Sequence, residues 1–223
     1  TRVSDAVLQV IQEGMFPVVI GGDHTSALGF HTGLARAHGQ TGILWVDTHP
    51  DLNTIETSPS GNIHGMVLAG LLGRGSEAML QTTNACQTLD AHVAMVGVRS
   101  AEEGEQRWLD EGKIHCMTMD VVREQGLETC MSNAIQTANK ATAGYGLTID
   151  IDALDPKDAP FVATPVADGL DTTDLITALA SIEDSQRLLG MEVVEFTPHQ
   201  DGDTAVACDL IYSLVTAVTG VAV

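Results

Sequence analysis

Basic residues are scarce in this sequence of 223 residues. Lysine and arginine together number 10, against 30 aspartate and glutamate residues, so the formal net charge at pH 7 is −20. Such an excess of negative charge repels nucleic acids and anionic membrane surfaces, and it attracts metal ions and basic small molecules. The charge therefore argues against a nucleic-acid-binding protein, although solubility alone is a sufficient reason for most of the acidic residues.

Long apolar segments and paired cysteines are also missing. No stretch approaches the ~18 consecutive apolar residues that a membrane-spanning helix needs, and the first residues show no signal-peptide pattern. The four cysteines, Cys86, Cys116, Cys130 and Cys208, are far apart and form no C-x-x-C pair. This spacing is typical of reduced thiols rather than of a disulfide framework or a zinc knuckle. We therefore expect a cytoplasmic protein with neither a membrane nor a nucleic acid as its partner.

Two periodicities of apolar residues alternate along the chain. Helix-like patterns include SDAVLQVIQEG, with Ser4 as a candidate N-cap and Gly14 as a stop, and a segment from about Ser26 to Ala37. Six short apolar runs predict strands: FPVVIGGDH, GILWVDTH, HVAMVGV, IHCMT, YGLTIDID and GMEVVEF. These runs are almost continuously apolar, which is typical of strands buried between two helical layers. The alternation predicts a three-layer αβα fold with a largely parallel sheet of these strands, in a single domain.

Side chains that can bind metals follow four of these strands at the point where each strand ends. They are Asp23 and His24, then Asp47, His49 and Asp51, then Asp150 and Asp152, and finally Glu195. The carboxyl ends of parallel strands meet at one edge of the sheet, where open α/β sheets bind their ligands. One aspartate at the end of a strand is usually a helix cap or a turn residue, but that explanation accounts poorly for four strands at once.

The motif WVDTHPD makes the most specific prediction. Side chains of an extended chain alternate between faces, so Asp47, His49 and Asp51 project to one side if strand geometry continues that far. Two carboxylates and an imidazole held close together repel one another and lose hydration, and a divalent cation offsets both effects. The motif therefore predicts a metal site.

Three motifs together resemble the metal-binding signatures of the ureohydrolases, the manganese enzymes that include arginase and agmatinase. They are GGDHT, DTHPD and TIDIDALDP, and the resemblance extends from VVIGGDH to the C-terminal helical pattern. It implies six metal ligands: His24, Asp47, His49, Asp51, Asp150 and Asp152. Four carboxylates and two neutral imidazoles suit two divalent ions such as Mn²⁺ better than zinc, which favours thiolates. Asp23 and Asp155 are expected to be turn or supporting residues.

The resemblance also implies a reaction. A pair of metal ions ~3.5–4 Å apart can hold a bridging water and lower its pKa enough to give hydroxide near neutral pH. In the family this hydroxide attacks a guanidinium carbon, so we expect hydrolysis of L-arginine to L-ornithine and urea. The implied catalytic residues are Asp51, which orients the hydroxide, His64, which passes a proton to the leaving amine, and Glu195, which holds the guanidinium.

The loop LNTIETSPSGNIHG makes arginase the most similar member of the family. The resemblance implies that Asn53 and Ser60, with Ser58 and Asn62, receive the α-carboxylate of arginine. Neutral donors are suitable there because a cation would repel the substrate guanidinium. Asn, Ser, Pro and Gly are equally common in an ordinary polar loop, which is the alternative.

Three further residues are implied to contact the substrate: Thr164 lies near the reacting guanidinium, and Glu102 and Glu105 recognise the α-amino group. Arginases usually have aspartate in place of Glu102, so at the amino-acid end of the substrate this sequence departs from the arginase pattern. Agmatine, a guanidino acid or N-hydroxyarginine are therefore alternative substrates. A solvated helix start is the other explanation for the two glutamates, because acidic residues favour helix N-termini.

Members of the family begin with a further strand and helix that have no counterpart before SDAVLQV. The resemblance then implies the sheet order 1-6-5-2-3-4, with the strand that leads to His24 at an exposed edge. It also implies a homotrimer or homohexamer. A truncated, non-catalytic metal-binding scaffold is the remaining alternative, and a two-metal phosphoesterase is disfavoured because the motifs contain no basic residue to bind phosphate.

Overall fold

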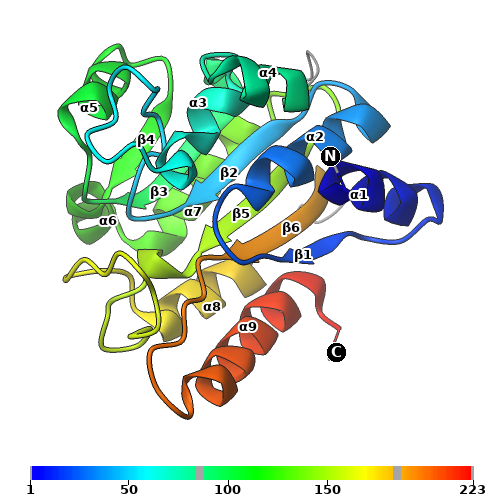
Figure 1. The fold of residues 1–223 in the computed structure, drawn as a ribbon. Helices are drawn as coiled ribbons and strands as arrows, with labels where there is room; N and C mark the ends of the chain where they lie inside the picture. Colours follow the sequence, from blue (N-terminus) through cyan, green and yellow to red (C-terminus); the bar gives the residue numbers. More distant parts are fainter. Residues whose placement is uncertain (1, 84–87, 183–186, 222–223) are drawn as a thin grey trace.

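The structure, a computed structural model, describes residues 2–83, 88–182 and 187–221. The described residues form a six-stranded parallel sheet between two layers of helices (Figure 1). In spatial order the strands are β1 (Val18–Ile20), β6 (Leu188–Val194), β5 (Tyr145–Asp150), β2 (Gly42–Val46), β3 (Val93–Val98) and β4 (His115–Thr118). The structure thus confirms the predicted fold class and the predicted strand order.

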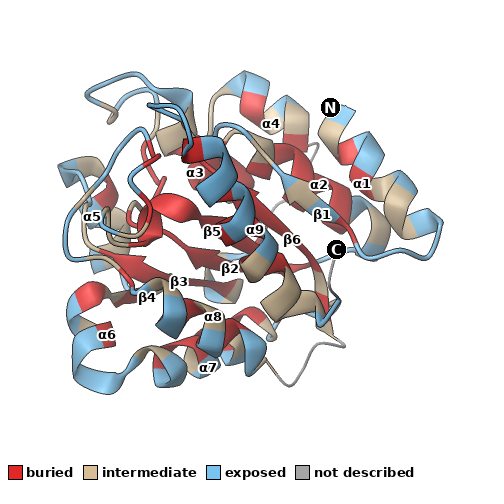
Figure 2. Cartoon of the chain, turned by 90° about the horizontal axis from the view of Figure 1, so that it is seen from below, coloured by how far each residue is buried: buried red, intermediate tan, exposed pale blue. Residues whose placement is uncertain are grey.

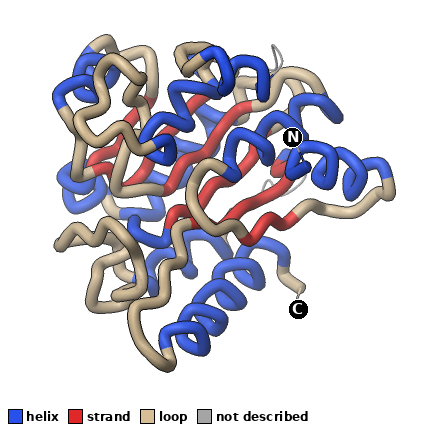
Figure 3. The backbone as a smooth tube through the Cα atoms, viewed as in Figure 1, coloured by secondary structure: helices blue, strands red, loops and turns tan. Residues whose placement is uncertain are grey.

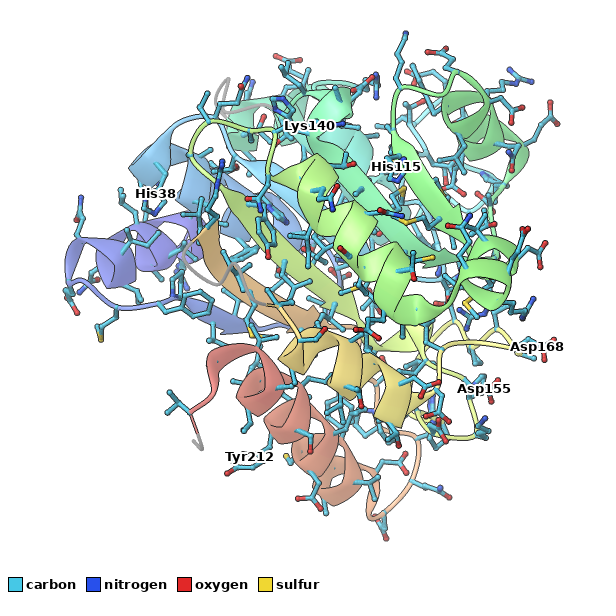
Figure 4. The ribbon with its side chains drawn as sticks, turned by 180° about the vertical axis from the view of Figure 1, so that it is seen from behind. His38, His115, Lys140, Asp155, Asp168 and Tyr212 are labelled. Atoms are coloured by element: carbon cyan, nitrogen blue, oxygen red, sulfur yellow. The ribbon has the colours of Figure 1, made fainter. Side chains whose placement is uncertain are left out.

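The helices divide between the two faces of the sheet. One layer contains α1 (Arg2–Gln12), α2 (Ser26–His38), α3 (Val67–Leu71) and α4 (Glu77–Thr83), with α5 (Glu103–Asp110) beside them. The opposite layer contains α6 (Met119–Gln125), α7 (Leu127–Ala138), α8 (Thr172–Ala180) and α9 (Asp203–Thr219), which lie in front of the sheet in Figure 4. Three short 3-10 turns complete the described elements: η1 (Ile63–Met66), η2 (Asp90–His92) and η3 (Ile151–Ala153).

Strand β2 shows why the sheet needs two covering layers. Leu44 and Val46 pack in the apolar cluster that contains α7 and α8, whereas Ile43 and Trp45 pack in the cluster that contains α2 and α3. All four side chains are fully buried, as are most residues of the central strands (Figure 2). The period of two along an almost continuously apolar strand therefore fills both cores at once.

Two local predictions were wrong. Ser4 is not the N-cap of the first helix, because α1 is already helical at Arg2 and Ser4 is buried inside its first turn. The VVI strand is not buried: β1 is the outermost strand, and Ile20 is 63% exposed. Its place at an exposed edge agrees with the expectation drawn from the family resemblance.

The connections after the strands gather at one end of the sheet (Figure 3). They include residues 47–62 after β2, 99–102 after β3 and 151–171 after β5. None of the helices described is long and apolar enough to cross a membrane. Three cysteines are free thiols, namely Cys116, Cys130 and Cys208, while Cys86 lies outside the described residues.

Candidate metal centre

His24 lies directly after β1 and points its Nδ1 atom at three carboxylates. The distances are 3.4 Å to Oδ2 of Asp47, 3.0 Å to Oδ2 of Asp51 and 3.1 Å to Oδ2 of Asp150. All four side chains are buried. Three strands, β1, β2 and β5, therefore bring one imidazole and three carboxylates to a single point beyond their carboxyl ends.

A second group lies beside the first and shares Asp47 with it. His49 Nδ1 lies 3.1 Å from Oδ2 of Asp152 and 3.7 Å from Oδ1 of Asp47. The ligand atoms of each group, His24–Asp47–Asp51 and Asp47–His49–Asp152, lie within 4.8 Å of one another. The six residues implied by the resemblance thus form two adjoining clusters, each of which could hold a metal ion.

Turns, rather than a continuing strand, bring the WVDTHPD side chains together. Strand β2 ends at Val46, and Oδ1 of Asp47 accepts a hydrogen bond from the backbone N–H of His49 at 2.7 Å. Asp51 has a φ of 52°, in the left-handed region that few residues adopt. Oδ1 of Asp150 accepts from the N–H of Asp152 at 2.8 Å in the same way. The convergence was predicted, but the extended geometry given as its reason was wrong.

Burial makes the cluster electrostatically costly without a cation. Burial, together with the negative charge of Asp152, raises the pKa of Asp150 to about 8. Burial and the carboxylates of Asp150, Asp152 and Asp51 likewise raise the pKa of Asp47. Burial lowers the pKa of His24, but its hydrogen bonds to Asp150 and Asp51 outweigh that effect and raise the pKa. Without metal the cluster therefore retains protons that a bound cation displaces.

The donor atoms fit two divalent cations. Oδ1 of Asp152 is buried and has no hydrogen-bond partner among the described residues, although an isolated buried carboxylate oxygen is unfavourable. The two histidines direct Nδ1 at carboxylates, and no thiol belongs to either cluster. Oxygen with imidazole nitrogen is a ligand set that suits manganese and similar ions.

Trp45 supports the first cluster and was not predicted to do so. Its indole Nε1 donates to Oδ2 of Asp47 at 2.9 Å, and its ring stacks on that of His24 with 4.3 Å between centroids and 10° between planes. One fully buried side chain therefore orients two candidate ligands. The only sequence signal was a tryptophan two residues before the first aspartate of the metal motif.

A second buried layer lies beneath His24 and was also missed. Thr148 donates to Oε1 of Glu192 at 2.8 Å and contacts Nε2 of His31 at 2.8 Å. Burial raises the pKa of Glu192 to about 7 and lowers the pKa of His31 to about 3. A lone glutamate within the apolar run GMEVV was the available signal, because a charge in a central strand needs a buried partner.

Glu192→Gln is expected to change how the stability of the metal-free protein depends on pH. The folded state holds the Glu192 proton up to about pH 7, whereas the unfolded chain releases it near 4.5, so the free energy of unfolding falls as pH rises between these values. The wild type should lose about 3 kcal/mol relative to the glutamine variant over this range. Urea unfolding of both proteins at pH 5 and pH 8 measures the difference, and parallel pH dependences would refute it.

Glu195, just after β6, faces the first cluster and the loop that contains His64. Its Oε1 accepts from the N–H of His24 at 2.8 Å and lies 3.2 Å from Nδ1 of His64. That hydrogen bond is the main reason why the pKa of His64 is raised. Glu195 has a φ of 67°, and its own N–H donates to the carbonyl oxygen of Gly22 at 2.7 Å. A strained, fixed backbone thus holds the carboxylate beside His64 and His24.

The residues expected to recognise the α-amino group are tied to the metal loop. Asn53 Nδ2 donates to Oε2 of Glu102 at 2.6 Å. The Glu105 carboxylate accepts from the N–H of Leu52 at 3.1 Å and from the N–H of Glu102 at 2.9 Å, which forms a capping box at the start of α5. Burial raises the pKa of Glu105 to about 7. Glu105 therefore orders the loop, while Glu102 and Asn53 face each other as an acceptor and donor pair.

The serine-rich loop is held by its own hydroxyls. Ser58 Oγ accepts from the N–H of Gly61 at 3.0 Å, and Ser60 Oγ accepts from the N–H of Asn62 at 3.2 Å. The two hydroxyl oxygens lie 3.4 Å apart. One of these hydroxyls donates to the other, and the second O–H group can donate to an anion, because an accepting hydroxyl retains its hydrogen.

One cavity of about 250 Å³ unites these groups. Every predicted site residue except Asp47, which is fully buried below it, lines this cavity: His24, His49, Asp51, Asn53, Ser58, Ser60, Asn62, His64, Glu102, Glu105, Asp150, Asp152, Thr164 and Glu195. Gly65 and Ser100 line it too and were not predicted. Asp23 and Asp155 are not among the lining residues, and their carboxylates accept backbone N–H groups of Thr25, Lys157 and Gly169.

Comparison with known proteins gives a consistent result. A model of the arginase family matches residues 1–217. The arginase of Bacillus caldovelox is 41% identical over 201 residues, which are 90% of this chain and 67% of that protein. Its native crystal structure has a TM-score of 0.91 at 38% identity and covers 99% of this chain and 74% of that chain. An Entamoeba histolytica arginase solved with L-ornithine is 26% identical, with a TM-score of 0.88 and coverage of 98% and 74%.

Proposed function

Because this chain belongs to the arginase family and is a hydrolase of the ureohydrolase type, we propose that it hydrolyses L-arginine to L-ornithine and urea with two Mn²⁺ ions. One observation carries the proposal. The cavity combines buried carboxylates at the sheet edge with neutral hydroxyl and amide donors from the loop after β2. A substrate that is cationic at one end and anionic at the other matches this distribution.

The residues that would hold the metal ions are His24, Asp47, His49, Asp51, Asp150 and Asp152. When bound, two divalent ions supply a water of lowered pKa, which is a nucleophile at neutral pH. Burial, and after it the negative charge of neighbouring aspartates, raises the pKa of Asp47 and of Asp150, and bound cations would offset both effects.

Three side chains would handle the guanidinium and its proton. Glu195 accepts N–H groups of the planar guanidinium, a geometry that favours a carboxylate partner. Thr164, whose hydroxyl donates to Oδ2 of Asp152 at 2.9 Å, lies where it can contact the same group. The hydrogen bond to Glu195 raises the pKa of His64, which favours the protonated imidazole that can serve as a proton donor to the leaving amine.

The loop after β2 would recognise the amino-acid end. Ser58, Ser60, Asn53 and Asn62 offer neutral donors for the α-carboxylate. Glu102 can accept the α-ammonium, and the Glu105 capping box fixes it relative to Asn53. The relative solved with L-ornithine supports this substrate class, because ornithine has the same α-amino and α-carboxylate groups as arginine.

A panel of substrates tests the proposal. The Mn²⁺-loaded protein should release urea from L-arginine with kcat/KM roughly 100-fold or more above that for agmatine, which lacks the α-carboxylate, and for 4-guanidinobutyrate, which lacks the α-amino group and is one methylene shorter. The reason is that each analogue leaves one set of polar partners in the cavity without the group that they would bind. Urea release, with metal content measured on the same sample, gives the ratios.

Glu102→Asp is the matched variant for this test, because it shortens the side chain by one methylene and keeps its charge. It should alter the KM for arginine and leave that for 4-guanidinobutyrate unchanged. A preference for agmatine or for the guanidino acid would refute the assignment of the loop while leaving the metal chemistry in place.

One observation favours a second candidate, a guanidino acid without an α-amino group. Glu102 is already engaged by Asn53 at 2.6 Å, and this pair needs no ammonium to satisfy it. The same panel decides between the two. Absence of turnover with metal bound would instead support a metal-binding scaffold. The trimer or hexamer implied by the resemblance stays a prediction.

A further inference from the structure

Arg99 follows β3 directly and directs its guanidinium at main-chain carbonyl oxygens of two other segments. It donates to the carbonyl oxygens of residues 152–154 at distances of 3.1, 3.1 and 3.2 Å. It also donates to those of Val166 and Ala167 at 2.7 and 3.1 Å, and it lies 3.4 Å from that of Gly97. One side chain thus bonds both ends of the loop that leaves β5 and returns towards α8.

Arginine is the side chain suited to this position. Its five N–H donors have a fixed planar arrangement, so several carbonyl oxygens can be bound at once, whereas a lysine ammonium offers three donors at one point. In the described part of the chain no carboxylate lies within ion-pair distance of Arg99. In so acidic a protein, a half-buried arginine that bonds only carbonyl oxygens acts as a clamp on the main chain.

The clamped loop contains two residues of the site. Asp152 lies at its start, and Thr164 lies two residues before the carbonyl of Val166. The two ends also meet at a bridge, where Leu170 N–H donates to the carbonyl oxygen of Ala153 at 3.0 Å. Figure 4 labels Asp155 and Asp168, which lie near each other beside this bridge. The contacts between the two ends of the loop therefore determine the position of Thr164 relative to Asp152.

Arg99 is anchored to the other metal loop as well. The N–H groups of Arg99 and Ser100 both donate to the carbonyl oxygen of Thr48, at 3.0 and 3.1 Å. Thr48 lies between Asp47 and His49, and its hydroxyl donates to the Asp152 carbonyl oxygen at 2.7 Å. Arg99 therefore links the ligands contributed by β2 to the ligand that follows β5.

We propose that Arg99 is a positioning residue that fixes Asp152 and Thr164 in the metal centre. The expected effect of Arg99 on kcat rests on the proposed function, whereas its expected effect on metal affinity does not. The hydroxyl of Thr164 donates a hydrogen bond to Oδ2 of Asp152. Oδ1 of Asp152 is buried and has no hydrogen-bond partner among the described residues. By holding the main chain of Asp152 and the main chain just after Thr164, at Val166 and Ala167, Arg99 determines which carboxylate oxygen is presented to a metal ion. Residues that orient a ligand in this way typically change metal affinity when they are replaced.

Replacement of Arg99 should leave the fold intact. Its outer side lines a cavity of about 650 Å³, together with Arg123, rather than filling the apolar core. Arg123 is the matched control, because it donates to a single carbonyl of the same loop, that of Asp168 at 2.8 Å, and is otherwise exposed. Arg99→Lys and Arg123→Lys make the same chemical change at two neighbouring arginines.

The experiment measures Mn²⁺ binding by titration calorimetry, together with kcat and KM for the substrate the wild type prefers. Arg99→Lys should weaken the affinity for at least one Mn²⁺ ion by about 10- to 100-fold and lower kcat by a similar factor, with KM changed less than about twofold. Arg123→Lys should change neither. In a double-mutant cycle with Thr164→Val, the effect of Arg99→Lys on kcat should be smaller than in the wild type, because both residues act on Asp152.

Two results would overturn the inference. One is a lower melting temperature for Arg99→Lys with Mn²⁺ affinity within twofold of the wild type, and the other is full additivity with Thr164→Val. If Arg99→Lys is insoluble, Thr48→Val tests the same link by removing the other donor to the Asp152 carbonyl, and unchanged Mn²⁺ affinity there counts against it. A protein that releases no urea refutes the proposed function, while the calorimetry still decides the role of Arg99.

Discussion

Asp152→Ala is expected to abolish Mn²⁺ binding at the second cluster and urea release together. Asp152 supplies the second cluster with its only carboxylate besides the shared Asp47. Its Oδ2 orients His49 at 3.1 Å, so loss of the carboxylate also frees that imidazole. Because activation of water by paired metals is worth several kcal/mol, the rate should fall by roughly 1,000-fold or more.

Thermal unfolding separates loss of metal from loss of fold. A ligand that binds only the native state raises its stability, so Mn²⁺ should raise the melting temperature of the wild type and raise it less in Asp152→Ala. In the metal-free proteins the variant should be folded, because it removes one of several mutually repelling buried carboxylates. Circular dichroism of both metal-free proteins checks this.

Asp23→Asn is the control for this prediction. Asp23 precedes His24 in the chain, yet its carboxylate accepts from the N–H of Thr25 at 2.9 Å and is not among the cavity-lining residues. It should bind metal and release urea as the wild type does. Normal metal content and turnover in Asp152→Ala would show that Asp152 is not a ligand.

The order of the sheet was predicted through the resemblance to the family, and the structure confirms it. The convergence of the metal-binding side chains at one edge, by contrast, follows from local pattern and strand direction. Asp47, His49, Asp150 and Asp152 lie at strand ends, and parallel strands end at a common edge. That these side chains meet at one edge therefore needed no knowledge of loop conformation, whereas their orientations depend on the turns after Val46 and Asp150.

What could not be predicted depends on partners far away in the chain. The hydrogen bond between Glu192 and Thr148 spans 44 residues, and the one between Arg99 and Asp152 spans 53. Neither Glu192 nor Arg99 carries a local signal of these partners. The prediction that Ser4 is an N-cap was wrong because it used only the local preference of serine for that position. The packing of α1 against α2 instead buries Ser4 within the helix. Hydrogen-bond direction and burial are properties of the fold, so they had to be observed.

Glu195→Gln is expected to leave both metal ions bound and to lower kcat/KM by roughly 1,000-fold, since a charged hydrogen-bonding partner of the reacting group is lost. Glutamine has nearly the same shape, and its amide oxygen can still accept the N–H of His24, which Glu195 does at 2.8 Å. The NH₂ group of glutamine, however, is a donor and would face the N–H donors of the guanidinium, so one hydrogen bond to the substrate is lost. No ligand in either cluster is altered.

The pH dependence distinguishes this explanation from general damage to the site. The hydrogen bond to Glu195 is the main cause of the raised pKa of His64, so in Glu195→Gln the His64 pKa should fall. If protonated His64 donates to the leaving amine, the alkaline limb of the kcat profile moves to lower pH with it. Glu103→Gln, which removes an exposed glutamate on α5, serves as the control for loss of one charge. Retained urea release by Glu195→Gln, or loss of its metal, would refute the assignment of Glu195 to the substrate rather than to the metal ions.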